Sequence, residues 1–177
     1  MTSYRRNIVL GGTYFFTVNL VDRSLQLLAE NVDALRGAFR YTRQRHPFAI
    51  DAIVVLPEHL HTIWTMPEGD GDFAIRWALI KARFSRALPH GETASASRTR
   101  RRERGIWQRR YWEHTIRDND DFAQHADYIH FNPVKHGHVE NVAAWPYSSF
   151  HRMVRLGTYP EDWAGNSKDP GTGLGER

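Results

Sequence analysis

The sequence predicts an α+β domain built on a mainly antiparallel sheet, with helices packed on one face. Short runs of β-branched and aromatic residues alternate with longer amphipathic segments, in the order strand, helix, strand, strand, helix, strand, helix. Leu56-Pro57-Glu58 turns the chain between two of the strands, so that the second returns beside the first. The 177 residues show no internal repeat and no deep boundary. We therefore expect one domain over residues 1–164, with a basic flexible loop at 89–105 and a flexible tail at 165–177.

Four segments have the composition of β-strands, because they are rich in β-branched and aromatic residues. They are residues 14–20, 48–55, 59–66 and 107–116. Gly11-Gly12 precedes the first of them and marks where it begins. The second and third lie on either side of the turn and are expected to pair with each other.

Three segments repeat apolar residues at helical spacing and are predicted to be helices, at residues 31–45, 73–88 and 118–132. Asn31 is placed to cap the first of them. The third should end at Asn132, because a residue that precedes proline avoids the α region. A short helix is expected at 140–145.

Composition excludes several classes of protein. The chain has no cysteine, so disulfides, thiolate metal sites and cysteine nucleophiles are all ruled out. No segment approaches the roughly 20 apolar residues of a membrane span. The basic N-terminus is not followed by the apolar region and cleavage site of a secretory signal. We therefore expect a cytoplasmic protein.

Positive charge is concentrated in one stretch. Residues 98–110 hold seven arginines against one acid, Glu103, and aromatic residues lie among and just after them. Arginines mixed with aromatics suit contact with single-stranded DNA, in which the backbone is held by charge and the bases stack. The alternative is a solvated basic loop. The residues expected to contact DNA are Arg100, Arg101, Arg102, Trp107, Arg109 and Arg110.

Two histidines one residue apart, His59 and His61, lie in a predicted strand. Side chains at i and i+2 of a strand point to the same face, with Cα atoms roughly 6.5–7 Å apart, so two imidazoles can reach one metal ion. The alternative is that they flank a buried leucine by chance. The remaining histidines of the C-terminal half are irregularly spaced, which favours solvent exposure or structural hydrogen bonds: His114, His125, His130, His136 and His138.

The predicted helix 118–132 carries Tyr128 and Asn132, four residues apart and so on the same side of the helix. A phenol would then lie beside an amide oxygen, and both could face the sheet. A hard ion such as Mg²⁺ or Mn²⁺, held by the two imidazoles, would accept the Asn132 oxygen and a phosphate oxygen. The alternative is a hydrogen-bonded core tyrosine with Asn132 as a helix C-cap.

These motifs together resemble the single-tyrosine HUH transposases of the IS200/IS605 type, and within them the branch of REP-associated tyrosine transposases. The resemblance covers nearly all of residues 4–165. It is carried by Leu56-Pro57-Glu58-His59-Leu60-His61 and by residues 127–137, with further support from residues 11–19, 107–114 and 145–150.

The resemblance implies an RRM/ferredoxin-like fold, with His59 and His61 as metal ligands, Tyr128 as the nucleophile and Asn132 as the third ligand. Asn132 departs from the insertion-sequence members, which carry Gln there. The implied activity is metal-dependent cleavage and rejoining of single-stranded DNA through a 5′-phosphotyrosine, at hairpins of repetitive extragenic palindromes (REP). The implied cofactor is Mg²⁺ or Mn²⁺. A monomer is expected, with a homodimer as the alternative.

Two other functions compete with this one. A non-catalytic module would bind DNA hairpins and form no covalent adduct. A metal-dependent phosphodiester hydrolase would activate water and release a free 5′-phosphate. The sequence does not specify the DNA target or the physiological metal.

Overall fold

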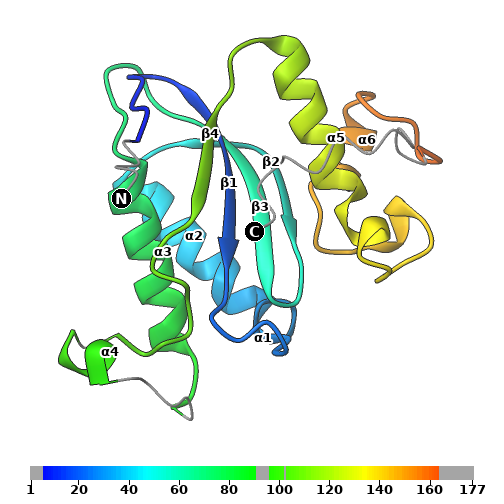
Figure 1. The fold of residues 1–177 in the computed structure, drawn as a ribbon. Helices are drawn as coiled ribbons and strands as arrows, with labels where there is room; N and C mark the ends of the chain where they lie inside the picture. The colour runs from blue at the N-terminus through cyan, green and yellow to red at the C-terminus, as the bar shows by residue number, and fades with distance from the viewer. Residues whose placement is uncertain (1–5, 91–95, 102, 164–177) are drawn as a thin grey trace, which may run out of the picture.

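The computed structural model describes residues 6–90, 96–101 and 103–163 (Figure 1). Its centre is a four-stranded sheet in the order β2-β3-β1-β4. The strands are β1 (Thr13–Asn19), β2 (Ala49–Val55), β3 (His59–Thr65) and β4 (Trp112–Thr115). Every neighbouring pair is antiparallel. The predicted α+β class with an antiparallel sheet is confirmed.

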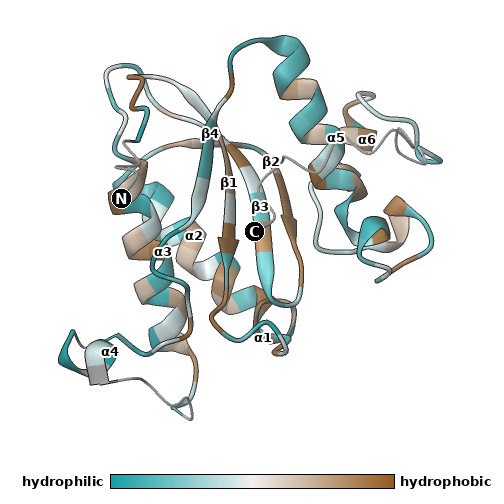
Figure 2. Cartoon of the chain, in the orientation of Figure 1, coloured by the Kyte–Doolittle hydropathy of each residue, from teal (hydrophilic) through white to brown (hydrophobic). Residues whose placement is uncertain are grey.

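One face of the sheet is covered by two helices, α2 (Val32–Arg45) and α3 (Phe73–Ala87). Alternate β1 residues, Tyr14, Phe16 and Val18, point to this face and are fully buried in the core that the helices complete. In Figure 2 much of β1 and β2 is brown, which marks hydrophobic residues. The helix α3 begins after Asp72, whose side chain accepts a hydrogen bond from the Ile75 N–H.

The opposite face carries a third helix, α5 (Asn119–Lys135). Here Phe15, Val54 and Ile63 form a second buried cluster with Tyr128 and other residues of α5. The expectation that helices pack on one face therefore holds for α2 and α3 but not for α5. The physical reason is that this side of the central strands is also apolar, and burial of that surface is favourable.

The outer edge of β2 is covered by residues 147–149. The Val55 N–H donates to the Tyr147 carbonyl at 2.9 Å, and the Ser149 N–H donates to the Ile53 carbonyl at 2.8 Å. This pairing removes an exposed strand edge, which would otherwise be open to association with another chain. The short helices η1 (Val142–Ala144) and α6 (Phe150–Arg155) flank it. The helix predicted at 140–145 corresponds to η1.

The helix α5 runs past the end that the sequence predicts. Proline at Pro133 does not stop it, and the helix continues to Lys135. The end is closed by backbone hydrogen bonds, from His136 N to the Asn132 carbonyl at 3.0 Å and from His138 N to the Pro133 carbonyl at 2.9 Å. Both Asn132 and Pro133 are buried, so packing outweighs the local preference of a residue before proline.

Three other predictions change. First, the N-terminal half contains a short helix, α1 (Leu27–Glu30), that the sequence pattern does not predict. The second is the expected loop 89–105, which contains a short helix, α4 (Ala96–Arg100), while its residues 91–95 and 102 lie outside the described part. The third is the strand predicted at 107–116, which narrows to β4. The predicted tail at 165–177 lies outside the described residues. No helix in the described ranges is long and apolar enough to cross a membrane.

Candidate active site

The two histidines of the His-x-His motif lie on β3, a central strand, and share the face that α5 covers. His59 is opposite Asn19 and His61 is opposite Thr17 in the pairing with β1. Their ring centres are 4.8 Å apart, and the side chains are 1% and 0% exposed. The strand geometry expected from the sequence thus brings the two imidazoles together.

Each imidazole is held by a partner on its Nδ1 atom. His59 Nδ1 lies 2.9 Å from the Glu58 carboxylate, and His61 Nδ1 lies 2.8 Å from the Thr17 hydroxyl. Neither Nε2 atom has a hydrogen-bond partner within the described residues, although both are buried. A partner on one ring nitrogen fixes the orientation of the ring and leaves the other nitrogen for a ligand.

Electrostatics favour the neutral imidazole that a metal requires. Burial, with added repulsion from His59, His136 and Lys135, lowers the pKa of His61 well below its ordinary value. Burial alone would raise the pKa of Glu58, but its hydrogen bond with His59 and the nearby positive charges lower it to about 2. Glu58 is therefore an anion next to His59 at neutral pH.

Tyr128 and Asn132 reach the same region from α5. Tyr128 is 3% exposed, and its ring centre lies 5.1 Å from that of His61. Asn132 follows one helical turn later and is fully buried, and neither polar atom of its amide has a hydrogen-bond partner among the described residues. Asn132 lies inside the helix, so the C-cap alternative for it is excluded.

The donor set fits a divalent cation. Two imidazole nitrogens and an amide oxygen are all buried, and none is satisfied by a hydrogen bond within the described ranges. Unsatisfied buried polar atoms are costly and call for a partner such as an ion. The amide oxygen, together with the oxygens that a phosphate would supply, suits Mg²⁺ or Mn²⁺.

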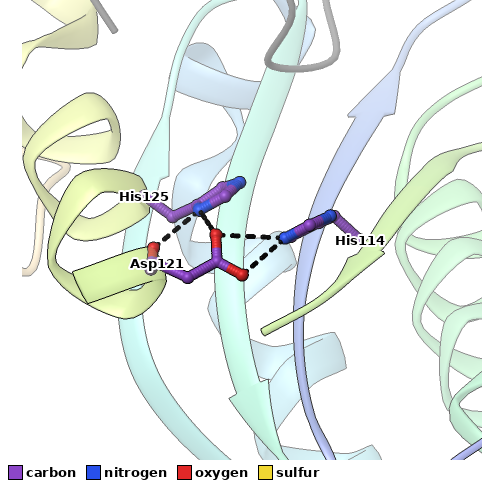
Figure 3. Close-up of side chains that lie close together, drawn as sticks. All are labelled: His114, Asp121 and His125. Carbon is purple, nitrogen blue, oxygen red and sulfur yellow. Dashed lines mark hydrogen bonds and ion pairs between the residues drawn. The ribbon is translucent and has the colours of Figure 1, made fainter. Parts of the chain in front are cut away.

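A second cluster joins β4 to the first turns of α5 (Figure 3). His114 Nε2 lies 2.8 Å from the Asp121 carboxylate, and His125 Nδ1 lies 2.8 Å from the Asp121 carbonyl oxygen. The Arg117 N–H and guanidinium also donate to this carboxylate, at 3.0 and 3.1 Å. Although burial opposes it, these hydrogen bonds lower the pKa of Asp121 to about 2.

The ligand atoms of His114, Asp121 and His125 all lie within 4.8 Å of one another, which is close enough for a metal ion. Hydrogen bonds account for the Asp121 contacts and tie α5 to the sheet, while the buried His125 Nε2 has no hydrogen-bond partner within the described residues. Residue spacing in the sequence does not predict this cluster. The four-residue spacing of Asp121 and His125 was the available signal, but His114 joins them only through the tertiary fold.

The residues expected to contact DNA lie in two segments, which a hydrogen bond from Arg109 to Ser97 of α4 connects. Arg100 and Arg101 are exposed at the end of α4, and Arg109 and Arg110 are exposed just before β4. Arg109 also pairs with Glu103, at 2.9 Å. Arg102 lies outside the described residues.

Trp107 is a correction to the predicted DNA contacts. It is 7% exposed, its ring centre lies 5.3 Å from that of Phe84, and it belongs to the core beneath α3. An indole that already packs in the core is not available to stack on a base. Its position beside arginines in the sequence does not reveal this burial.

A groove of about 770 Å³ lies away from the histidines, between α2 and the edge of β2. Its floor includes Phe39 and Ile53. Arg43 and Arg152, which border it, donate to backbone carbonyls. None of the proposed metal ligands lines the groove, so we place the candidate active site at the His59–His61 pair and not there.

Known proteins are similar to this chain over nearly its whole length. No protein-family model matches. A REP-associated tyrosine transposase of Escherichia coli K12 is 49% identical over 169 residues, covering 96% of this chain and 94% of that protein. A Haemophilus influenzae protein named for the same family is 50% identical over 167 residues, covering 94% and 95%. A solved structure described as this kind of transposase bound to a REP hairpin has a TM-score of 0.87 and 48% identity, covering 100% of this chain and 98% of that one.

Proposed function

This chain belongs to the family of REP-associated tyrosine transposases, and on that premise we propose that it cuts and rejoins single-stranded DNA at REP-type hairpins with Tyr128 as the nucleophile. The observation that carries the proposal is the meeting of Tyr128 with the histidine pair. The phenol ring lies 5.1 Å from the His61 ring, on the side of the sheet where both histidine Nε2 atoms are unsatisfied within the described residues.

His59 and His61, through Nε2, and Asn132, through its amide oxygen, would hold a divalent cation, Mg²⁺ or Mn²⁺. When bound, such an ion supplies positive charge that offsets the charge developing on a reacting phosphate. Glu58 and Thr17 keep the two rings in the orientation that leaves Nε2 open. Because both histidines are buried, their positions are set before DNA arrives.

Tyr128 would carry out the covalent step. Its hydroxyl oxygen forms a bond to the phosphorus while the bond from phosphorus to the 3′-oxygen breaks, and the phenolic proton ends on that 3′-oxygen. The products are a 5′-phosphotyrosine and a free 3′-hydroxyl. The ester keeps the energy of the broken bond, so another 3′-hydroxyl can attack it and rejoin a strand without ATP.

The surroundings of Tyr128 favour attack on the phosphotyrosine ester by a 3′-hydroxyl over its hydrolysis by water. Its side chain is 3% exposed and packs with Phe15 and Ile129 in an apolar cluster. Apolar packing limits the access of water to the ester that would form there. His61 and Tyr128 also come from one chain, so we propose that a single subunit contains a complete site and that the protein acts as a monomer.

Exposed arginines at the end of α4 and just before β4 would hold the DNA backbone. Arg100, Arg101, Arg109 and Arg110 are proposed to contact phosphates, since all four are accessible. Arg102 stays among the proposed contacts on the sequence alone. Trp107 is not proposed, because it is in the core.

The test is a denaturing gel with end-labelled DNA that carries a REP hairpin and single-stranded flanks. With Mn²⁺, the wild-type protein should yield a slow-migrating protein–DNA adduct, and Tyr128→Phe should yield none while it still binds the DNA. Tyr41→Phe, which removes a hydroxyl from α2, is the matched control and should behave as wild type. Binding without any adduct would favour a hairpin-binding module. A free 5′-phosphate that persists in Tyr128→Phe would favour a hydrolase.

A further inference from the structure

The continuation of α5 through Pro133 places one more charged residue on the side of the helix that carries Tyr128. Lys135 is seven residues, or two turns, beyond Tyr128, and Asn132 lies between them. The Lys135 ammonium nitrogen is 4.9 Å from the centre of the Tyr128 ring. A helix that ended at Asn132 would not present this lysine beside the phenol.

The charge of Lys135 acts at the candidate active site and not only at the surface. The Tyr128 ring that its ammonium approaches has its centre only 5.1 Å from that of the His61 ring. Unlike Tyr128 and Asn132, which are buried, Lys135 is an exposed residue. Its ammonium therefore lies beside the buried Tyr128 ring, on a residue that solvent and a DNA phosphate can reach.

Resting on the proposed function, we propose that Lys135 binds a non-bridging oxygen of the phosphate that Tyr128 attacks. The phosphate carries a negative charge before reaction, and additional charge develops on its oxygens as the phenol oxygen adds. An ammonium on a flexible four-carbon stem is a common phosphate ligand and can follow that change. Lys135 moves no proton in this step, and its role is to position and neutralise the phosphate.

Binding measurements test the contact without catalysis. The DNA affinity is measured in EDTA in the Tyr128→Phe background, with either a native phosphate or a neutral methylphosphonate at successive positions of the single-stranded flank. Lys135→Gln should weaken binding of the native DNA about tenfold. At one position the methylphosphonate should abolish this difference, because the oxygen charge that Lys135 contacts is gone. Arg155→Gln, which removes an exposed charge from α6, should leave the pattern unchanged.

Cleavage provides the second readout. Single-turnover adduct formation should fall about 100-fold in Lys135→Gln and recover to within about tenfold of wild type in Lys135→Arg. A tenfold binding loss that persists at every methylphosphonate position would overturn the proposal, as would equal losses in Arg155→Gln. If wild type forms no adduct, the proposed function fails. The binding arm would still decide whether Lys135 contacts a phosphate.

Discussion

Replacing Glu58 by Gln should weaken metal binding without removing any metal ligand. The Glu58 carboxylate lies 2.9 Å from His59 Nδ1, and its side chain is 14% exposed. Its pKa of about 2 means that it is charged at neutral pH, so the hydrogen bond from His59 is charge-assisted. Such a bond keeps the Nδ1 proton in place and makes Nε2 a stronger donor to a metal.

The size of the effect follows from the kind of interaction that is lost. A hydrogen bond to a charged group contributes about 1.5–3 kcal/mol, and each 1.4 kcal/mol is about tenfold in affinity. Glu58→Gln keeps an acceptor and loses the charge, so we expect about a tenfold loss of Mn²⁺ affinity. Glu58→Ala loses both and should cost nearer 100-fold.

Calorimetric titration with Mn²⁺ measures this directly, and the Mn²⁺ concentration that gives half-maximal adduct formation should shift in parallel. Glu30→Gln, an exposed glutamate of α1, is the control and should bind as wild type. Unchanged Mn²⁺ affinity in both Glu58 variants would show that Glu58 does not support His59 in metal binding.

Three further predictions concern the tie between β4 and α5 and the arginines at the end of α4. Asp121→Ala should lower the free energy of unfolding by about 2 kcal/mol, measured with urea, because it removes the buried carboxylate that accepts hydrogen bonds from His114 and Arg117. A change below about 0.5 kcal/mol would contradict the role given to the cluster. Because the Asp121 pKa is lowered to about 2, the stability that its carboxylate contributes should be complete above pH 4 and lost toward pH 2, and Asp121→Asn should not show this loss. Replacing Arg100 and Arg101 together by Gln should make the slope of log affinity against log salt less negative by about 1.4 for single-stranded DNA, and an unchanged slope would show that neither residue contacts phosphate.

Local patterns predicted the parts of the site that depend on chain geometry alone. The period of two along a strand places His59 and His61 on one face, and the structure agrees. The four-residue spacing on a helix places Tyr128 and Asn132 on one side, and Tyr128 does lie against His61. Both inferences need only the type of element and not the tertiary fold.

The features that sequence patterns missed all depend on tertiary packing. Trp107 stands among arginines in the chain, yet it is buried because the segment before β4 crosses the core beside Phe84. The helix α5 ends later than its local pattern predicts, because burial of Pro133 outweighs the local effect of the proline. His114 meets Asp121 only because β4 lies beside the start of α5. None of these contacts leaves a periodic signal.

The most direct measurement is the identity of the residue that becomes bonded to DNA. Wild-type protein is incubated with Mn²⁺ and a REP-hairpin oligonucleotide, digested with protease and nuclease, and analysed by tandem mass spectrometry. We predict a nucleotide 5′-phosphate attached to the peptide that contains Tyr128, and no other modified tyrosine. A phosphate on a different side chain, or cleaved DNA with no modified peptide, would contradict the assignment of Tyr128 as the nucleophile.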